Sequence, residues 1–189
     1  MAKIQPVPLA GYATRFLPER YANYELSSIG AHREGGRYNP PGIAVLYTSL
    51  QRMTALAEVT ELYTDEDPLS PHTMYTVEFN LTRVFDLTDA TVLERLQTTT
   101  DELCAPVHVR SRGNAPTQVL GSVLVELGLE ALRAPSRCRD EGTNLVIFTD
   151  NAQPPAYALY RDVAERPAPL DVPASSNVVP FPPQRNRNV

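Results

Sequence analysis

The segment from residue 35 to residue 58 reads GGRYNPPGIAVLYTSLQRMTALAE. Its glycines permit backbone conformations that are closed to other residues, and its prolines restrict φ, so the segment opens with a loop of defined shape. The near-continuous apolar run at 43–49 predicts a buried strand. Apolar side chains then recur at spacings of three and four, which predicts an amphipathic helix over 50–63. This order of loop, strand and helix decides how the first half of the chain folds.

The rest of the chain mixes short β-rich runs with further helical patterns, without the regular alternation of a doubly wound sheet. An α+β fold is therefore predicted. Helices are expected at 89–96 and at 117–127, the latter with Gly128 as its C-cap, and irregular structure is expected between Thr98 and Pro116. Each expected strand is bounded by Gly, Pro, Asn or Asp. Besides 43–49, these strands are 11–16, 73–81, 83–87, 130–134 and 144–148.

Composition bounds the domain organisation. The chain has 189 residues, of which 42% are hydrophobic and 21% are charged, so one domain can bury a sufficient core. Proline becomes frequent after Arg166, and proline disfavours both helix and sheet. The sequence thus predicts a folded domain at 1–165 and a Pro-rich, flexible C-terminal tail at 166–189.

Charge and cysteine usage exclude several classes of protein. A net charge of -5 argues against direct nucleic-acid binding, which depends on clustered Lys and Arg. The sequence has neither a signal peptide nor an apolar run long enough for a membrane span, so we expect a cytoplasmic protein. Cys104 and Cys138 lack the CxxC spacing of a zinc site and are expected to be free thiols, with no metal bound.

Arg37 stands at the centre of the shaped loop. Gly36, immediately before it, allows the backbone to approach a ligand closely, and the planar guanidinium matches phosphate oxygens. The loop is therefore a candidate phosphate-binding element. The alternative is an ordinary surface loop with a solvated Arg.

Tyr47 and Glu58 are the next candidates. Tyr47 lies toward the end of the buried strand, where its ring either stacks on a flat ligand or packs in the core with its hydroxyl on a backbone partner. Glu58 lies on the helix face that also carries Ala55, Val59 and Leu62. A carboxylate on a buried face is costly unless it has a partner or a function. The alternative is a Glu at the edge of the apolar stripe, paired with an Arg.

Ser136 follows a proline at the end of a short strand, and Asn144 begins the next buried strand. Ser136 either orients a ligand hydroxyl or is an ordinary turn residue. It is a poor candidate for a hydrolase nucleophile, because no GxSxG elbow surrounds it.

Taken together, several of these segments resemble the RES-domain family of bacterial toxins, in matching order and with similar spacing, from about Arg15 to Phe148. The family is named for an Arg, a Glu and a Ser, and Arg37, Glu58 and Ser136 stand at those motif positions. The segments that carry the resemblance are 35–42, Tyr47, 55–58, 117–121, 135–136 and 144–145.

The resemblance implies an ADP-ribosyltransferase-like split antiparallel β-sheet with flanking helices. It also implies a toxin of a toxin–antitoxin module that cleaves the nicotinamide–ribose bond of NAD, as an NAD glycohydrolase or an NAD phosphorylase. NAD is then a substrate, with water or inorganic phosphate as acceptor, and no cofactor is expected. Members of the family are usually encoded beside a helix-turn-helix antitoxin, so an oligomer with such a partner is implied. The alternatives are a mono-ADP-ribosyltransferase that modifies a cellular protein and a non-catalytic binding module.

The same resemblance assigns roles to residues. Glu58 would stabilise the cation that forms on the ribose, Tyr47 would pack against nicotinamide, and Ser136 would orient ribose or amide. Arg37 would hold the pyrophosphate, helped by Arg15. The expected catalytic residues are thus Glu58, Arg37, Tyr47 and Ser136, and the expected substrate-binding residues are Arg15, Gly36, Tyr38 and Asn144.

The chain departs from the family pattern at two places. Tyr38 stands where the family more often carries Trp, a change that keeps an aromatic ring. Residues 149–152 stand where many members carry an Asn-Pro pair.

Overall fold

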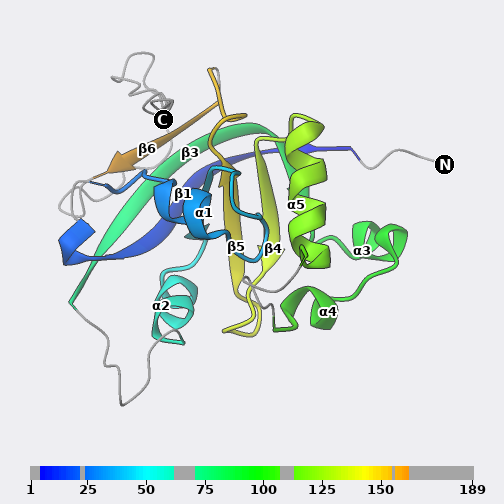
Figure 1. Cartoon of the computed structure of the whole chain (residues 1–189), viewed down its shortest axis with the longest axis horizontal. Helices are drawn as coiled ribbons and strands as arrows, with labels where there is room; N and C mark the ends of the chain where they lie inside the picture. Colours follow the sequence, from blue (N-terminus) through cyan, green and yellow to red (C-terminus); the bar gives the residue numbers. More distant parts are fainter. Residues whose placement is uncertain (1–4, 22–23, 62–70, 107–112, 155, 162–189) are drawn as a thin grey trace.

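The computed structural model describes residues 5–21, 24–61, 71–106, 113–154 and 156–161, in which strands and helices are interspersed (Figure 1). The predicted tail lies outside these residues. The mixture of one sheet with flanking helices is the α+β organisation that the sequence predicts. The strands are β1 (Val7–Pro18), β2 (Val45–Ser49), β3 (His72–Asp86), β4 (Ala131–Pro135), β5 (Thr143–Phe148) and β6 (Tyr157–Arg161). The helices are α1 (Ile29–Glu34), α2 (Arg52–Thr60), α3 (Ala90–Leu96), α4 (Thr100–Cys104) and α5 (Pro116–Glu126), with a 3-10 turn η1 (Glu19–Tyr21).

The strands form a sheet in the order β1-β2-β5-β4-β3-β6, and β1 also pairs with β3. The β1–β3 ladder is long, from Val7 opposite Val84 to Pro18 opposite His72. Among the described strands β3 and β4 run parallel, whereas all other pairs are antiparallel. The antiparallel pairing that the resemblance implies is therefore observed except at β3–β4, and the ADP-ribosyltransferase-like split sheet stays a prediction.

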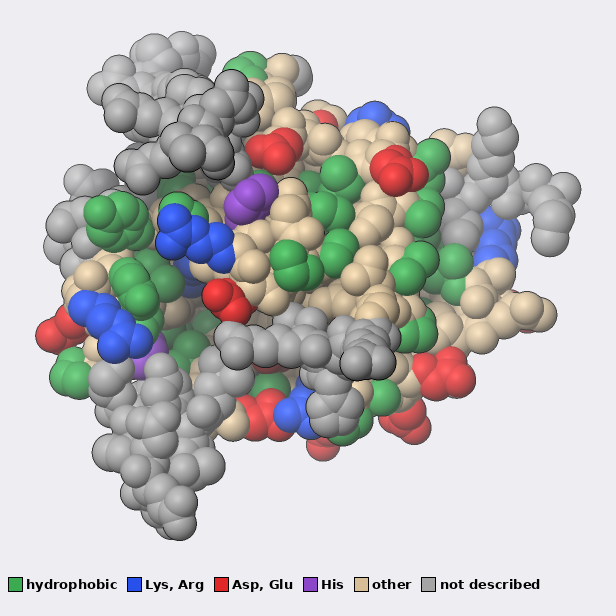
Figure 2. All heavy atoms as spheres, viewed as in Figure 1, with side chains coloured by type: hydrophobic (Ala, Val, Ile, Leu, Met, Phe, Trp, Pro, Cys, Tyr) green, Lys and Arg blue, Asp and Glu red, His purple; other side chains and the backbone are tan. Residues whose placement is uncertain are grey.

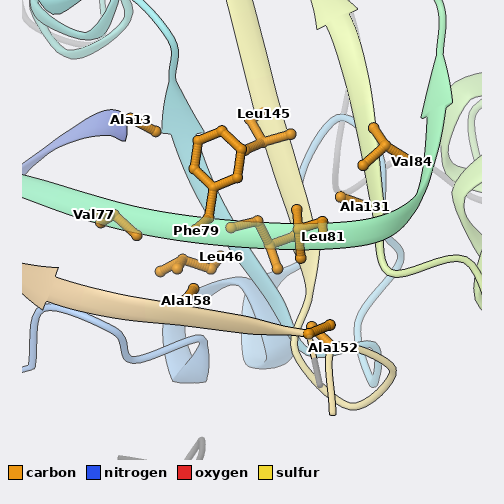
Figure 3. Close-up of a cluster of buried hydrophobic side chains, with 12 residues drawn as sticks. Ala13, Leu46, Val77, Phe79, Leu81, Val84, Ala131, Leu145, Ala152 and Ala158 are labelled. Carbon is orange, nitrogen blue, oxygen red and sulfur yellow. The ribbon is translucent and has the colours of Figure 1, made fainter. Parts of the chain in front are cut away.

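The core consists of two clusters, one on each face of the central strands. On β5, Leu145 and Ile147 belong to the first cluster and Val146 and Phe148 to the second, because successive side chains of a strand point to opposite faces. Figure 3 shows the first cluster, in which side chains of several strands lie together. The second cluster includes residues of the helices α3, α4 and α5, which are Val92, Leu103 and Leu124.

Strand β3 differs from the prediction, because 73–81 and 83–87 form one continuous strand. The reason lies in Glu130, which is 8% exposed. Its carboxylate accepts hydrogen bonds from the backbone amides of Thr82 at 2.6 Å and Arg83 at 3.1 Å, and from the Thr82 hydroxyl at 2.7 Å. Glu130, from a distant part of the chain, thus satisfies the polar groups of Thr82 and Arg83, where the predicted strand was divided. The strand therefore continues through these residues.

The C-terminus of α5 also corrects a prediction. Leu127 is the C-cap, and Gly128 follows it with a φ of 74°. The Gly128 amide donates to the carbonyl of Val125 at 2.9 Å, and the Leu129 amide donates to the carbonyl of Leu124 at 3.0 Å. This is a Schellman motif, in which glycine stands one position beyond the cap because it tolerates the left-handed conformation.

Four further elements, η1, α1, α4 and β6, were not expected from the sequence. Helix α4 lies where irregular structure was predicted, and a capping box stabilises it: the Thr99 hydroxyl accepts from the Glu102 amide while the Glu102 carboxylate accepts from the Thr99 amide. Strand β6 pairs with β3. Helix α2 spans 52–60, so it is shorter than the predicted 50–63, whose last two residues lie outside the described part.

Helix α5 is held through one face. On its other face Val119, Val123 and Leu127 are 44–61% exposed, and Figure 2 shows hydrophobic side chains on this part of the surface. The spacing of four between these residues places them on one side of the helix. The residues that anchor the helix are Thr117, Gln118, Gly121 and Leu124, all of which are buried.

Gly121→Ala should destabilise the fold. A Cβ at this position would lie 1.8 Å from the carbonyl oxygen of Tyr38, which is backbone, so helix and loop would have to separate. We expect urea denaturation to show a loss of at least about 1–3 kcal/mol. Gly30→Ala is the matched control, because a Cβ there meets no atom within 4 Å. Equal stabilities of the two variants would contradict the close approach.

Candidate functional site

Glu58 lies in the last turn of α2 and is half-buried. Its Oε1 atom accepts a hydrogen bond from the Ser136 hydroxyl at 2.7 Å and one from the Asn144 side-chain amide at 2.6 Å. Both donors are neutral, so the contact leaves the negative charge of the carboxylate uncompensated. The structure thus brings three of the predicted site residues together, and these contacts of Glu58 are not the Arg pair that was the alternative.

The register of β4 and β5 explains why Ser136 and Asn144 both reach Glu58. Ala134 of β4 lies opposite Asn144, and the Ser136 amide donates to the Gly142 carbonyl at 2.8 Å, so pairing continues past the end of β4. Ser136 and Asn144 therefore point to the same face as diagonal neighbours. The backbone amide of Cys138 donates to the Ser136 Oγ at 3.1 Å, which restrains that hydroxyl.

A second carboxylate, Glu61, lies one turn after Glu58. It forms an ion pair with Arg137 and accepts a hydrogen bond from the Cys138 thiol. These bonds lower the pKa of Glu61, whereas burial, followed by the hydrogen bond to Glu61, raises the pKa of Cys138. Glu61 is exposed and already paired with a cation, so it differs from Glu58 in chemical character.

The loop after α1 is built around Asn39, which is fully buried. Its side-chain nitrogen donates to the carbonyls of Ala31 at 2.8 Å and Ile43 at 3.0 Å. Its side-chain oxygen accepts from the Tyr47 hydroxyl at 2.7 Å, and that hydroxyl in turn accepts from the Tyr38 amide at 3.0 Å. The hydroxyl of Tyr47 is therefore engaged in shaping the loop, and burial raises the pKa of this residue.

Gly36 and Gln118 close the same loop. A Cβ on Gly36 would lie 2.5 Å from the Tyr47 hydroxyl, so the backbone runs directly against this side chain. Gln118, from α5, donates to the Gly36 carbonyl at 2.9 Å and accepts from the Ala115 amide at 3.0 Å. The glycine is thus needed for packing within the protein, and its approach to a ligand stays a prediction.

Arg37 is oriented by α4. Its Nη1 atom donates to the carbonyls of Leu103 at 2.9 Å and Ala105 at 2.6 Å, at the C-terminal end of that helix. Unpaired carbonyls at a helix C-terminus carry partial negative charge and attract cations. A guanidinium offers five N–H donors, so these two bonds leave donors that a ligand phosphate can use.

Tyr38 follows Arg37 in the same loop. Its side chain is 2% exposed, and its hydroxyl has no hydrogen-bond partner among the described residues. Burial raises the pKa of Tyr38; the charge of Arg37 lowers it, and the charges of Cys104 and Glu58 raise it. The charges of Arg37 and Glu58 thus both act on this phenol, in opposite directions.

Arg15, on β1, is held separately. Its Nη1 atom donates to the carbonyls of Glu25 at 2.9 Å and Ser27 at 3.0 Å. Burial lowers the pKa of Arg15 to about 10. These bonds join β1 to the segment before α1 and do not connect Arg15 to the Glu58 group.

The sequence missed several residues that hold the site. Ser49 donates to the side-chain oxygen of Asn144 at 2.6 Å, and Asn39 and Gln118 hold the loop. Gln118 carried one usable signal, because a polar residue on the buried face of an amphipathic helix needs a partner. The α4 carbonyls that accept from Arg37 gave no signal in the sequence, since every residue has a backbone carbonyl.

The described residues form neither a metal site nor a membrane-spanning helix. They contain no group of three or more His, Cys, Asp and Glu residues that could hold a metal ion. No helix among them is long and apolar enough to cross a membrane.

Comparison with known proteins identifies the family. The model of the RES domain matches residues 13–171. The chain belongs to the RES family. No match was found among curated proteins. The RES domain described here is also similar to a chain in the crystal structure of the M. tuberculosis MbcT–MbcA toxin–antitoxin complex, with a TM-score of 0.63 and 18% identity over 84% of this chain and 85% of that chain. The two proteins therefore share a fold.

Tyr47→Phe should destabilise the RES domain. The change removes the hydroxyl that serves the buried Asn39 oxygen and the Tyr38 amide. Groups left unsatisfied in this way cost about 1–3 kcal/mol, which urea denaturation would measure. Tyr24→Phe is the control because Tyr24 is 60% exposed. A Tyr47→Phe protein as stable as the control would show that the hydroxyl does not hold the loop.

Proposed function

We propose that this RES domain is the toxin of a toxin–antitoxin module and that it degrades NAD by cleaving the nicotinamide–ribose bond. The observation that carries the proposal is the half-buried Glu58, held by the neutral donors Ser136 and Asn144. Family membership and the fold shared with a chain of a toxin–antitoxin complex support it.

The chemistry needs a fixed negative charge. When the bond between ribose C1 and the nicotinamide nitrogen breaks, the electron pair leaves with nicotinamide and positive charge develops on the ribose. A carboxylate already oriented toward that position stabilises the charge without reorganising. Glu58 suits this task because its hydrogen bonds orient it while leaving its charge in place. Water then adds to C1 and loses a proton, which yields ADP-ribose.

The other residues would bind the dinucleotide. Arg37, which donates to carbonyls at the end of α4, would use its remaining N–H donors to bind the pyrophosphate. The ring of Tyr47 would pack against nicotinamide while its hydroxyl holds the loop. Ser136, Asn144 and Gly36 have partners within the protein, so we propose that they act on the substrate mainly by placing Glu58 and the loop. Arg15 would contribute from β1, and no cofactor is needed.

An antitoxin partner belongs to the same proposal. The chain that shares this fold was crystallised as part of a toxin–antitoxin complex. We propose that a helix-turn-helix protein binds this RES domain and blocks access to Glu58. Co-expression would test it, because a protective partner restores growth of cells that produce the wild-type chain.

Glu58→Gln should abolish NAD cleavage and leave the fold intact. Gln retains an oxygen that can accept from Ser136 and Asn144, but it removes the charge. Loss of a preorganised electrostatic group commonly costs about 10²–10³ in rate, and nicotinamide release measures it.

Glu61→Gln is the matched control for this variant. Glu61 is the C-cap of the same helix but is exposed and paired with Arg137, so its loss should change nicotinamide release by less than about threefold. Unchanged release by the Glu58→Gln protein would refute the proposed role.

Nicotinamide release with and without inorganic phosphate identifies the acceptor. Release that requires phosphate indicates a phosphorylase, and release without it indicates a glycohydrolase. Labelling of proteins in a cell extract by labelled NAD would indicate a mono-ADP-ribosyltransferase. No release and no labelling would favour a non-catalytic binding module and contradict the proposal.

Arg37→Ala should weaken NAD binding. Measured by calorimetry in a Glu58→Gln background, where NAD is not consumed, Kd should rise about ten- to a hundredfold, because charge-assisted bonds to phosphate are lost. Thr99→Ala is the control: it removes the cap of α4 without changing the guanidinium. An equal loss of affinity in both variants would show that the order of α4, and not a phosphate contact, explains the effect.

A further inference from the structure

Ser49 is the last residue of β2 and is 3% exposed. It lies directly opposite Asn144 in the antiparallel β2–β5 ladder, so the two side chains share a face. The Ser49 hydroxyl donates to the side-chain oxygen of Asn144 at 2.6 Å. Neither family membership nor the sequence pattern assigns a role to Ser49.

The bond continues to the carboxylate. Asn144 donates through its side-chain nitrogen to Glu58 Oε1 at 2.6 Å. Because the amide group is planar, fixing its oxygen at Ser49 also fixes the direction of its N–H bonds. Hydrogen bonds in series also polarise one another, so the bond at the oxygen strengthens donation by the nitrogen.

Ser136 reaches the same carboxylate oxygen at 2.7 Å. Both donors thus end on Oε1, and Oε2 accepts from neither of them. Two donors, one from the turn after β4 and one from β5, restrain the rotation of the carboxylate group. One oxygen of the Glu58 carboxylate is thus anchored to two elements of the protein.

The neighbouring residue Thr48 provides a contrast. Its hydroxyl donates to the backbone carbonyl of Leu145 at 2.8 Å and is buried on the opposite face of the same two strands. That bond joins β2 to β5 and has no connection to Glu58. The Ser49 hydroxyl instead donates to the side chain of Asn144, which contacts the Glu58 carboxylate.

We propose that Ser49 is a positioning residue, which acts through Asn144 to hold the Glu58 carboxylate in one orientation. Its effect on turnover rests on the proposed NAD cleavage. Its effect on Asn144 and Glu58 does not, because it is a property of the unliganded protein.

Ser49→Ala is the first test. In nicotinamide release, kcat should fall about ten- to a hundredfold, as expected when a reacting group is displaced slightly. KM for NAD should stay within about twofold, since the change leaves Arg37 and its loop untouched. Ser49→Thr retains the hydroxyl and should recover most of the lost kcat. Thr48→Val, the matched control, should leave kcat within about twofold.

A wild-type kcat for Ser49→Ala would overturn the proposal, and so would an equal loss in Thr48→Val, which would indicate a general weakening of the β2–β5 pair. A rise in KM with unchanged kcat would also overturn it, because it would indicate a role in binding.

A second measurement is independent of NAD. The side-chain amide signals of Asn144 in a ¹H–¹⁵N spectrum are assigned by their loss in Asn144→Asp. Ser49→Ala and Glu58→Gln should each shift these signals, whereas Thr48→Val should not. Unshifted signals in Ser49→Ala overturn the proposal even if NAD is cleaved. Shifted signals in a protein that releases no nicotinamide support the positioning role and refute the proposed reaction instead.

Discussion

Two hydrogen bonds to one oxygen of Glu58 tie α2 to the turn after β4 and to the start of β5. A half-buried carboxylate is stable there only if its donors are themselves held in place. Asn144 is held from β2 by Ser49, and Ser136 is held by the Cys138 amide. Three strands and a helix therefore cooperate to place a single charge, and the rest of the site is arranged relative to it.

The loop at 35–42 is held in place in a different way. Its backbone is fixed by buried amide side chains, because Asn39 and Gln118 each use both a donor and an acceptor within the protein. Such fully satisfied networks are rigid. Arg37 extends from this loop to the end of α4, so its guanidinium is oriented before any ligand arrives.

The fold was predictable where local pattern and tertiary context agree. Strands β2 and β5 and helix α5 correspond closely to their predicted ranges because apolar periodicity and capping residues mark them. Strand β3 was divided in the prediction because the carboxylate that satisfies Thr82 and Arg83 comes from Glu130. Helix α4 is only one turn long, and β6 gains its hydrogen bonds from β3, so neither has a strong pattern of its own.

The sequence by itself determined that a Gly- and Pro-shaped loop carries Arg37, that a buried strand follows, and that Glu58 interrupts an apolar helix face. These are local properties, set by residue type and by the period of a helix or a strand. The tertiary structure alone decided what each of these groups touches. Ser136 and Asn144 lie 78 and 86 positions from Glu58, and the carbonyls that orient Arg37 lie 66 and 68 positions away. Contacts at such separations arise from strand register and helix packing, which no local pattern encodes.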